Sequence, residues 1–179
     1  MKNPQVGIVM GSASDLEAME AAADALEELR VSCEMRVLSA HRTPEEVHEY
    51  VREAPGRGIR VLIAGAGMAA HLAGMVGAAT DLPVIGVPMD ASSLNGLDAL
   101  LSTVQMPPGI PVATMGIGSA GARNAGLFAA RILALSDPAI AKRYRKFAQG
   151  QRDKVLKADR KLQKQRAARK KSPKRAARK

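Results

Sequence analysis

Short apolar segments recur along the chain and alternate with segments that have helical periodicity. Five of them have the length and composition of strands: Val6–Met10, Cys33–Leu38, Val61–Ala64, Leu82–Val87 and Ile110–Thr114. The first contains no polar residue, which is typical of a parallel strand that is buried on both faces. The pattern predicts a sheet in the interior of the protein.

Helical segments follow these strands. After the first strand, apolar residues recur every three or four positions and predict a helix that ends near Arg30. Further helices are expected at residues 44–53, 95–104, 120–135 and 138–162. The chain therefore alternates between strand and helix over most of its length.

Two helix starts carry a capping box, in which Glu follows a capping Ser or Thr by three residues. Ser14 with Glu17 predicts one box, and Thr43 with Glu46 predicts the other. Pro44 occupies the first helical position of the second helix, a position that proline favours. The free amides of this second helix start would then face the preceding loop, where they can bind an anion.

Alternating strands and helices predict an α/β domain, because parallel neighbours need right-handed helical crossovers. We expect a three-layer α-β-α architecture around a doubly wound parallel sheet with the flavodoxin-like strand order 2-1-3-4-5. The first three strands are then neighbours, and ligands bind at the carboxyl ends of such strands. Their following loops, GSASD, SAHRTP and GAGMAAH, should meet around one pocket.

Positive charge is concentrated at the carboxyl end of the chain. The formal net charge is +10, and the part from Arg152 to Lys179 holds 14 of the 27 Lys and Arg but only two of the 17 Asp and Glu. The rest of the chain therefore has a net charge of −2. We expect a single catalytic domain at 1–162, including the last helix, and a basic, disordered tail at 163–179 that binds polyanions weakly.

Composition limits the class of protein further. Hydrophobic residues make up 46% of the 179 residues and aromatic residues only 2%, so an aliphatic core is expected. The lone cysteine, Cys33, excludes an intramolecular disulfide and is expected to be buried, in a reducing compartment. No run approaches the roughly 20 apolar residues of a membrane span, and no cationic leader precedes the first strand. A cytoplasmic protein without membrane contact is expected.

The predicted pocket collects side chains suited to chemistry on an anionic ligand. His41 can give and take a proton near neutral pH, and the guanidinium of Arg42 can bind phosphate or carboxylate with forked donors. The hydroxyl of Ser12 suits a phosphate, the carboxylate of Asp15 suits ribose hydroxyls, and His71 adds a second imidazole. A single loop histidine is more often structural, but three such loops at one edge favour a phosphorylated sugar or nucleotide and proton transfer.

Motifs for common cofactors are weak or missing. Gly65–Ala70 fits the pattern G-x-G-x-x-A, but it follows the third strand rather than the first, and no acidic residue stands at the usual spacing. The sequence has no G-x-x-x-x-G-K loop, and its three scattered histidines form no recognisable metal set. Neither a nicotinamide cofactor nor a metal ion is therefore expected.

Five segments between Val6 and Leu135 occur in a characteristic order: GSASD, SAHRTP, AGAGMAAHLAGM, PVIGVP and QMPPGIPVAT. Together they resemble the class I 5-(carboxyamino)imidazole ribonucleotide mutases of purine biosynthesis. The chain departs from that family at Met68, where a small residue is usual, and at Ala73, where proline is usual. The resemblance implies a homo-octamer of three-layer domains with no metal or organic cofactor.

The resemblance also implies a reaction, in which the carboxylate on the exocyclic nitrogen of the substrate moves to carbon 4 of the imidazole. His41 matches the general acid and base of the family. The substrate-binding positions that it implies are Ser12, Ser14, Asp15, Ser39, Arg42 and His71. Carbon dioxide released on the way would need a closed, dry pocket, which the small residues of the third loop would permit.

Two other functions remain possible from the residues. One is a related carboxylase that joins free carbon dioxide to aminoimidazole ribonucleotide. Arg42 favours the mutase, because the carboxylase typically has lysine there. The other is a nucleotide-binding module that uses the basic tail on nucleic acid.

Overall fold

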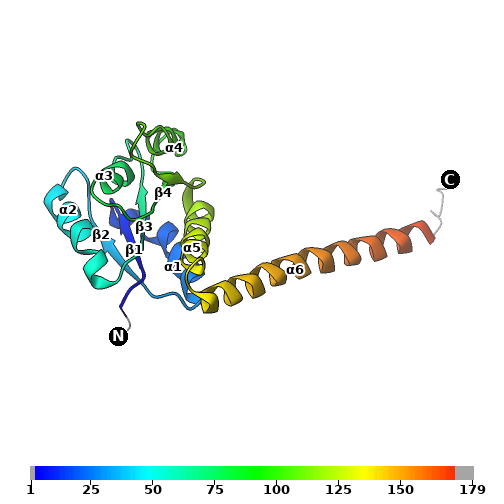
Figure 1. Ribbon diagram of the computed structural model, residues 1–179. Helices are drawn as coiled ribbons and strands as arrows, with labels where there is room; N and C mark the ends of the chain where they lie inside the picture. The colour runs from blue at the N-terminus through cyan, green and yellow to red at the C-terminus, as the bar shows by residue number, and fades with distance from the viewer. Residues whose placement is uncertain (1–2, 172–179) are drawn as a thin grey trace.

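The computed structural model describes residues 3–171, with side chains described up to residue 168. Its centre is a five-stranded parallel sheet in the order β2-β1-β3-β4-β5, which confirms the predicted order (Figure 1). The strands are β1 (Val6–Met10), β2 (Cys33–Val37), β3 (Val61–Ala66), β4 (Val84–Pro88) and β5 (Ala113–Thr114).

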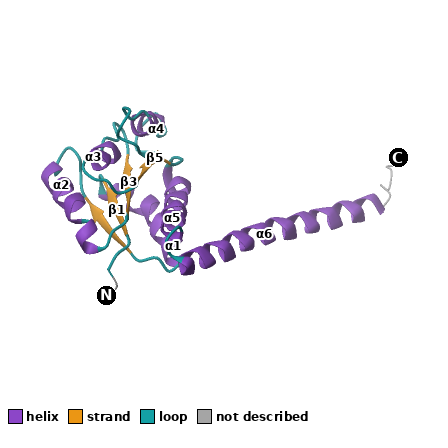
Figure 2. Ribbon diagram, viewed as in Figure 1, coloured by secondary structure: helices purple, strands orange, loops and turns teal. Residues whose placement is uncertain are grey.

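Helices cover both faces of this sheet, as Figure 2 shows. They are α1 (Leu16–Glu28), α2 (Pro44–Glu53), α3 (Leu72–Ala78), α4 (Leu97–Val104), α5 (Gly118–Ala134) and α6 (Pro138–Lys171). One core cluster joins the sheet to α1 and α5, and the other joins it to α2 and α3. The predicted three-layer α/β architecture is therefore confirmed.

Small side chains let α1 and α5 pack closely together. Ala22 and Ala25 of α1 and Ala122 and Ala125 of α5 are fully buried. A Cβ atom at Gly126 would collide with the carbonyl oxygen of Ala22. Glycine costs a helix about 1 kcal/mol relative to alanine, and here that cost is offset by the close approach of the two helices.

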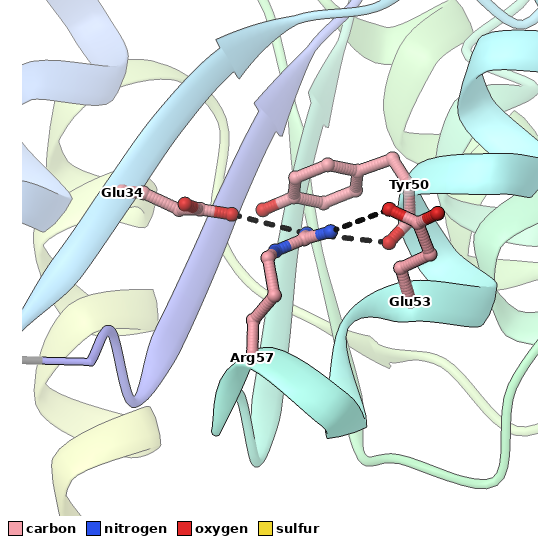
Figure 3. Close-up of polar contacts among 4 residues, drawn as sticks. All are labelled: Glu34, Tyr50, Glu53 and Arg57. Atoms are coloured by element: carbon pink, nitrogen blue, oxygen red, sulfur yellow. Dashed lines mark hydrogen bonds and ion pairs between the residues drawn. The ribbon is translucent and has the colours of Figure 1, made fainter.

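A polar cluster lies between β2 and α2, near the amino-terminal ends of the strands (Figure 3). Arg57, in the short 3-10 helix η2 (Pro55–Arg57), lies with its guanidinium 4.6 Å from the centre of the Tyr50 ring. Arg57 Nη2 also pairs with Glu34 at 3.1 Å, and Nη1 pairs with Glu53 at 3.3 Å. This cluster holds η2 against the edge strand.

Neither predicted capping box forms. Thr43 precedes α2, but its Oγ1 accepts from the Ser39 amide at 2.9 Å and donates to the Ser39 carbonyl at 3.2 Å instead of capping the helix. Ser14 lies inside the short 3-10 helix η1 (Ala13–Asp15), where its amide donates to Ser12 Oγ at 3.2 Å. In both cases contacts within the loop replace the cap.

Two further expectations need correction at the edges of the sheet. The last strand spans only Ala113–Thr114 rather than starting at Ile110, because Pro111 has no N–H to donate to a strand ladder. Cys33 is only partly buried, because β2 is an edge strand. Cys33 does pack against the core, as predicted, but it is not fully buried.

The last helix is longer than predicted. α6 continues to Lys171 rather than ending near Leu162, so residues 163–171 are helical and not disordered. Ile140 is buried, and Tyr144 and Phe147 pack against the core. Residues 148–168 are all exposed, and α6 extends away from the domain (Figure 1). The remaining part of the predicted tail, residues 172–179, lies outside the described residues.

None of the helices within residues 3–171 is both long enough and apolar enough to span a membrane.

Candidate active site

Three loops leave the sheet at the carboxyl ends of β1, β2 and β3. In the strand register, Met10 of β1 lies beside Val37 of β2 and Gly65 of β3. The ladders continue one step further, because the Leu38 amide donates to the Met10 carbonyl at 2.9 Å and the Gly11 amide donates to the Gly65 carbonyl at 3.1 Å. The three loops therefore start at the same edge, as the strand order predicted.

Two imidazoles meet at this edge. Nε2 of His41, in the loop after β2, lies 2.7 Å from Nδ1 of His71, which immediately precedes α3. The ring centres are 4.8 Å apart and the ring planes are nearly perpendicular, at 80°. A hydrogen bond of this kind needs one nitrogen that carries a proton and one that does not. The contact therefore fixes the two tautomers relative to each other.

The loop after β2 is folded around Ser39. Its Oγ accepts from the backbone amide of Arg42 at 3.3 Å and from Arg42 Nε at 3.2 Å. Arg42 Nη2 donates to the carbonyl oxygen of Gly11 at 2.8 Å, across to the loop after β1. These contacts place a fixed positive charge between two of the three loops.

The loop after β1 supplies hydroxyls and one buried carboxylate. Ser14 Oγ donates to Ser12 Oγ at 2.8 Å and lies 3.4 Å from Asp15 Oδ1. Asp15 is only 6% exposed. Burial raises the pKa of its carboxyl above the ordinary 3.8, and hydrogen bonds from Ser14 and from the Ser12 backbone oppose that shift.

The loop after β3 has an unusual backbone. Met68 and Ala70 adopt left-handed conformations, with φ of 57° and 42°. Such a conformation costs a residue with a Cβ atom about 1–2 kcal/mol. The Ala70 amide closes the turn by donating to the Gly67 carbonyl at 3.0 Å. Met68, one of the two departures noted in the sequence, is thus an exposed side chain on a strained turn.

The loop after β4 also reaches this edge, and it was not among the three loops predicted to form the site. The Met89 amide donates to the Ala66 carbonyl at 2.9 Å, and a Cβ atom at Gly67 would lie 2.5 Å from that of Ala91. The signal available in the sequence was the polar stretch Asp90–Ser93, directly after the apolar strand.

The predicted site residues come from three loops that meet at one edge, but one chain does not enclose them. His41, Arg42, Met68, Ala69 and His71 are exposed to solvent. The closed pocket expected from the small residues of the third loop is therefore not formed by the single chain. Within residues 3–171, no three His, Cys, Asp or Glu side chains are grouped closely enough to hold a metal ion. The arrangement offers imidazoles suited to proton transfer, a guanidinium suited to an anion, and a carboxylate with hydroxyls suited to polar groups of a ligand.

Comparison with known proteins gives a consistent result. The family described as AIR carboxylase matches residues 5–154. A protein of Pyrococcus abyssi named N5-carboxyaminoimidazole ribonucleotide mutase is 59% identical over 144 residues, which cover 80% of this chain and 82% of the relative. The protein of the same name from Mycobacterium tuberculosis H37Rv is 54% identical over 162 residues, which cover 90% of this chain and 92% of the relative.

A solved structure shares the fold. The crystal structure of Treponema denticola PurE superposes with a TM-score of 0.81 at 32% sequence identity, over 89% of this chain and 98% of that one.

Proposed function

Because the chain belongs to the AIR carboxylase family and acts as an N5-carboxyaminoimidazole ribonucleotide mutase, an isomerase of purine biosynthesis, we propose that His41 carries the proton transfers of this reaction. The observation that supports this assignment is the contact of 2.7 Å between His41 Nε2 and His71 Nδ1, at the edge where three loops meet. An imidazole can act as acid and as base within one turnover.

The reaction can be written with one group that gives and then regains a proton. The bond between the exocyclic nitrogen and the carboxylate breaks, carbon dioxide forms, and His41 protonates the nitrogen. Carbon 4 then attacks the retained carbon dioxide, and the new carbon–carbon bond forms. His41 removes the proton from carbon 4, so that the enzyme returns to its starting state with no net proton consumed.

The surrounding residues hold the substrate. We assign the phosphate to the hydroxyls of Ser12 and Ser14, with the ribose hydroxyls on the Asp15 carboxylate. Ser39 and Arg42 are assigned to the phosphate or the migrating carboxylate, since Arg42 provides several donors in one plane. His71 lines the site and orients His41 through the contact between the two rings.

The assignment of His41 is tested with His41→Asn, which keeps some hydrogen bonding but cannot titrate. Turnover should fall by at least about a hundredfold while substrate binding is largely kept, in line with the usual contribution of general acid and base catalysis. Isothermal titration with substrate and a steady-state assay separate the two effects. Turnover close to that of the unchanged protein would show that another group transfers the proton.

Substrate choice provides a second test. Carbon dioxide that is generated and held in the site has a high effective concentration, so the carboxyamino substrate should convert in bicarbonate-depleted buffer. Labelled bicarbonate should enter the product only slightly. Bicarbonate-dependent turnover of aminoimidazole ribonucleotide with full incorporation of label would instead indicate a carboxylase. Arginine at position 42 would then not distinguish a mutase from a carboxylase.

We further assign the working form to a cytoplasmic homo-octamer, as the family resemblance implies. Two observations support an assembly of some size. The catalytic edge is open in the single chain, and α4 with its preceding loop presents an exposed apolar stripe at helical spacing. The stripe consists of Leu94, Leu97, Leu101 and Val104. Native mass spectrometry tests the octamer directly, and Leu97→Gln with Leu101→Gln should reduce both assembly and activity.

A further inference from the structure

The outer part of α6 does not pack on the core of the catalytic domain, although Gly150, Gln151 and Lys154 border a hollow beside residues 28–30. The last side chains that pack on the core are Ile140, Tyr144 and Phe147. Residues 148–168 are exposed throughout, and Figure 1 shows this part of the helix projecting from the body. The family model matches residues 5–154, so it ends within this projecting segment.

Five basic residues form a stripe along the projecting helix. They are Lys154, Lys157, Arg160, Lys161 and Lys164. With 3.6 residues per turn, these positions fall within an arc of about 120° on one side of the helix. At a rise of about 1.5 Å per residue, the stripe is about 15 Å long. The helix thus presents one continuous cationic face.

Among the described side chains, no ion pair neutralises the charge of this face. The ion pairs found among the described side chains involve Arg57 and Arg123, and none involves α6. The two carboxylates of the projecting segment, Asp153 and Asp159, instead accept hydrogen bonds from Gln149 at 2.8 Å and from Gln163 at 3.3 Å. Like charges three or four residues apart on a helix repel each other, so the stripe gains from an external anion.

We propose that this cationic face of α6 binds the phosphate backbone of duplex nucleic acid. One strand of a duplex presents a phosphate about every 3.4 Å along the axis. A stripe about 15 Å long therefore runs alongside about four or five phosphates, which matches its five basic residues. The major groove, about 12 Å wide, admits an α-helix. Contacts from Lys and Arg to phosphates carry no sequence information, so binding through this stripe should be independent of sequence.

A membrane surface fits the segment less well. Interfacial helices bury a broad apolar face that usually includes aromatic residues. Residues 148–168 contain no aromatic residue, and their only large apolar side chains are Val155, Leu156 and Leu162. Leu156 lies about 100° around the helix from Val155, so these side chains do not form one broad face.

The experiment measures binding of the full chain to a 20-base-pair duplex DNA by fluorescence anisotropy at several salt concentrations. The test variant carries Lys157→Gln, Lys161→Gln and Lys164→Gln, since glutamine has nearly the helix propensity of lysine. Affinity at low salt should fall at least about tenfold. The slope of log K against log salt should become shallower by about 2.7, because each of the three lost phosphate contacts contributes about 0.9.

A matched control separates the stripe from net charge. Arg52→Gln, Arg60→Gln and Arg145→Gln remove the same charge from exposed positions outside the stripe, and this variant should bind within about twofold of the unchanged chain. Mutase activity and circular dichroism should be unchanged in the stripe variant. Equal losses in the control and stripe variants, or no loss in either, would overturn the proposal. Equally tight binding to polyglutamate or to anionic vesicles would overturn the choice of nucleic acid.

Discussion

Arg42 Nη2 donates to the carbonyl oxygen of Gly11 at 2.8 Å and so joins the loop after β2 to the loop after β1. The same guanidinium donates through Nε to Ser39 Oγ at 3.2 Å. A planar group can make both contacts in fixed directions, whereas the ammonium of lysine is a single point of charge on a flexible stem. The charge at this edge is therefore held in place by the protein before substrate binds.

Replacing Arg42 with lysine should separate charge from geometry. The Lys variant keeps the positive charge but cannot reach Ser39 and Gly11 together, so we expect KM to rise about tenfold or more with a smaller change in kcat. Steady-state kinetics with the carboxyamino substrate measure both constants. An unchanged KM would mean that the forked geometry of Arg42 is not used on the substrate.

Replacing His71 should change catalysis through His41. In His71→Asn the amide group can take the place of Nδ1 and keep a partner for His41, whereas His71→Ala removes it. We expect kcat to fall about 10- to 100-fold in the Ala variant, clearly less in the Asn variant, and KM to change little in either. The pH profile of kcat should also shift in the Ala variant. Equal activity of both variants with an unchanged profile would exclude this positioning role.

The buried carboxylate of Asp15, which we assign to substrate binding, should lower the stability of the folded protein. Because burial raises the pKa of its carboxyl in the folded protein, the folded state holds the proton more tightly, and stability falls as the pH rises through the window above the ordinary 3.8. Asp15→Asn should therefore raise Tm at pH 7 by a few degrees, since about 1 kcal/mol corresponds to about 2–4 °C in a chain of this size. The gain should shrink toward pH 4, and substrate affinity should drop. Thermal melts at both pH values provide the check, and a lower Tm at pH 7 would contradict it.

Tyr50 offers a test of the polar cluster in Figure 3. Its hydroxyl is buried and meets no partner at acceptable hydrogen-bond geometry among the described residues, although Glu34 and Arg57 lie beside it, and burial followed by Glu34 raises its pKa. Tyr50→Phe keeps the ring beneath the Arg57 guanidinium and removes the unpaired hydroxyl, so the free energy of unfolding should stay equal or rise by up to about 1 kcal/mol. Tyr50→Ala should cost about 3–5 kcal/mol. Urea unfolding distinguishes the two, and a clear loss in the Phe variant would show that the hydroxyl has a partner.

The strand order and the meeting of the three loops followed from the sequence because both depend on the alternation of strands and helices, which spans the whole domain. The details of the loops did not follow. Thr43 and Ser14 fit the capping pattern, but the hydroxyl of Thr43 bonds to Ser39 and the amide of Ser14 bonds to Ser12. The capping-box spacing does not show which of several hydrogen-bond partners the side chain will choose.

The helical conformation at the end of α6 was also not predicted from the sequence, for a different reason. The lack of large apolar residues after Leu162 correctly indicates that residues 163–168 are exposed, but a helix needs only local hydrogen bonds and good helix formers. Residues 163–171 are rich in alanine, lysine, arginine and glutamine, which favour helix. Composition therefore predicted the exposure of this segment better than its conformation.

Charge is divided unevenly along the chain, and α6 is its positive end. The part before Arg152 has a net charge of −2, whereas residues 152–171 of α6 hold ten Lys and Arg against two Asp, a net charge of +8. Near a polyanion such a molecule is turned so that the helix approaches first, while the body is weakly repelled. The edge that carries His41 and Arg42, which we assign to an anionic ribonucleotide, would thereby be kept at a distance from a competing polyanion.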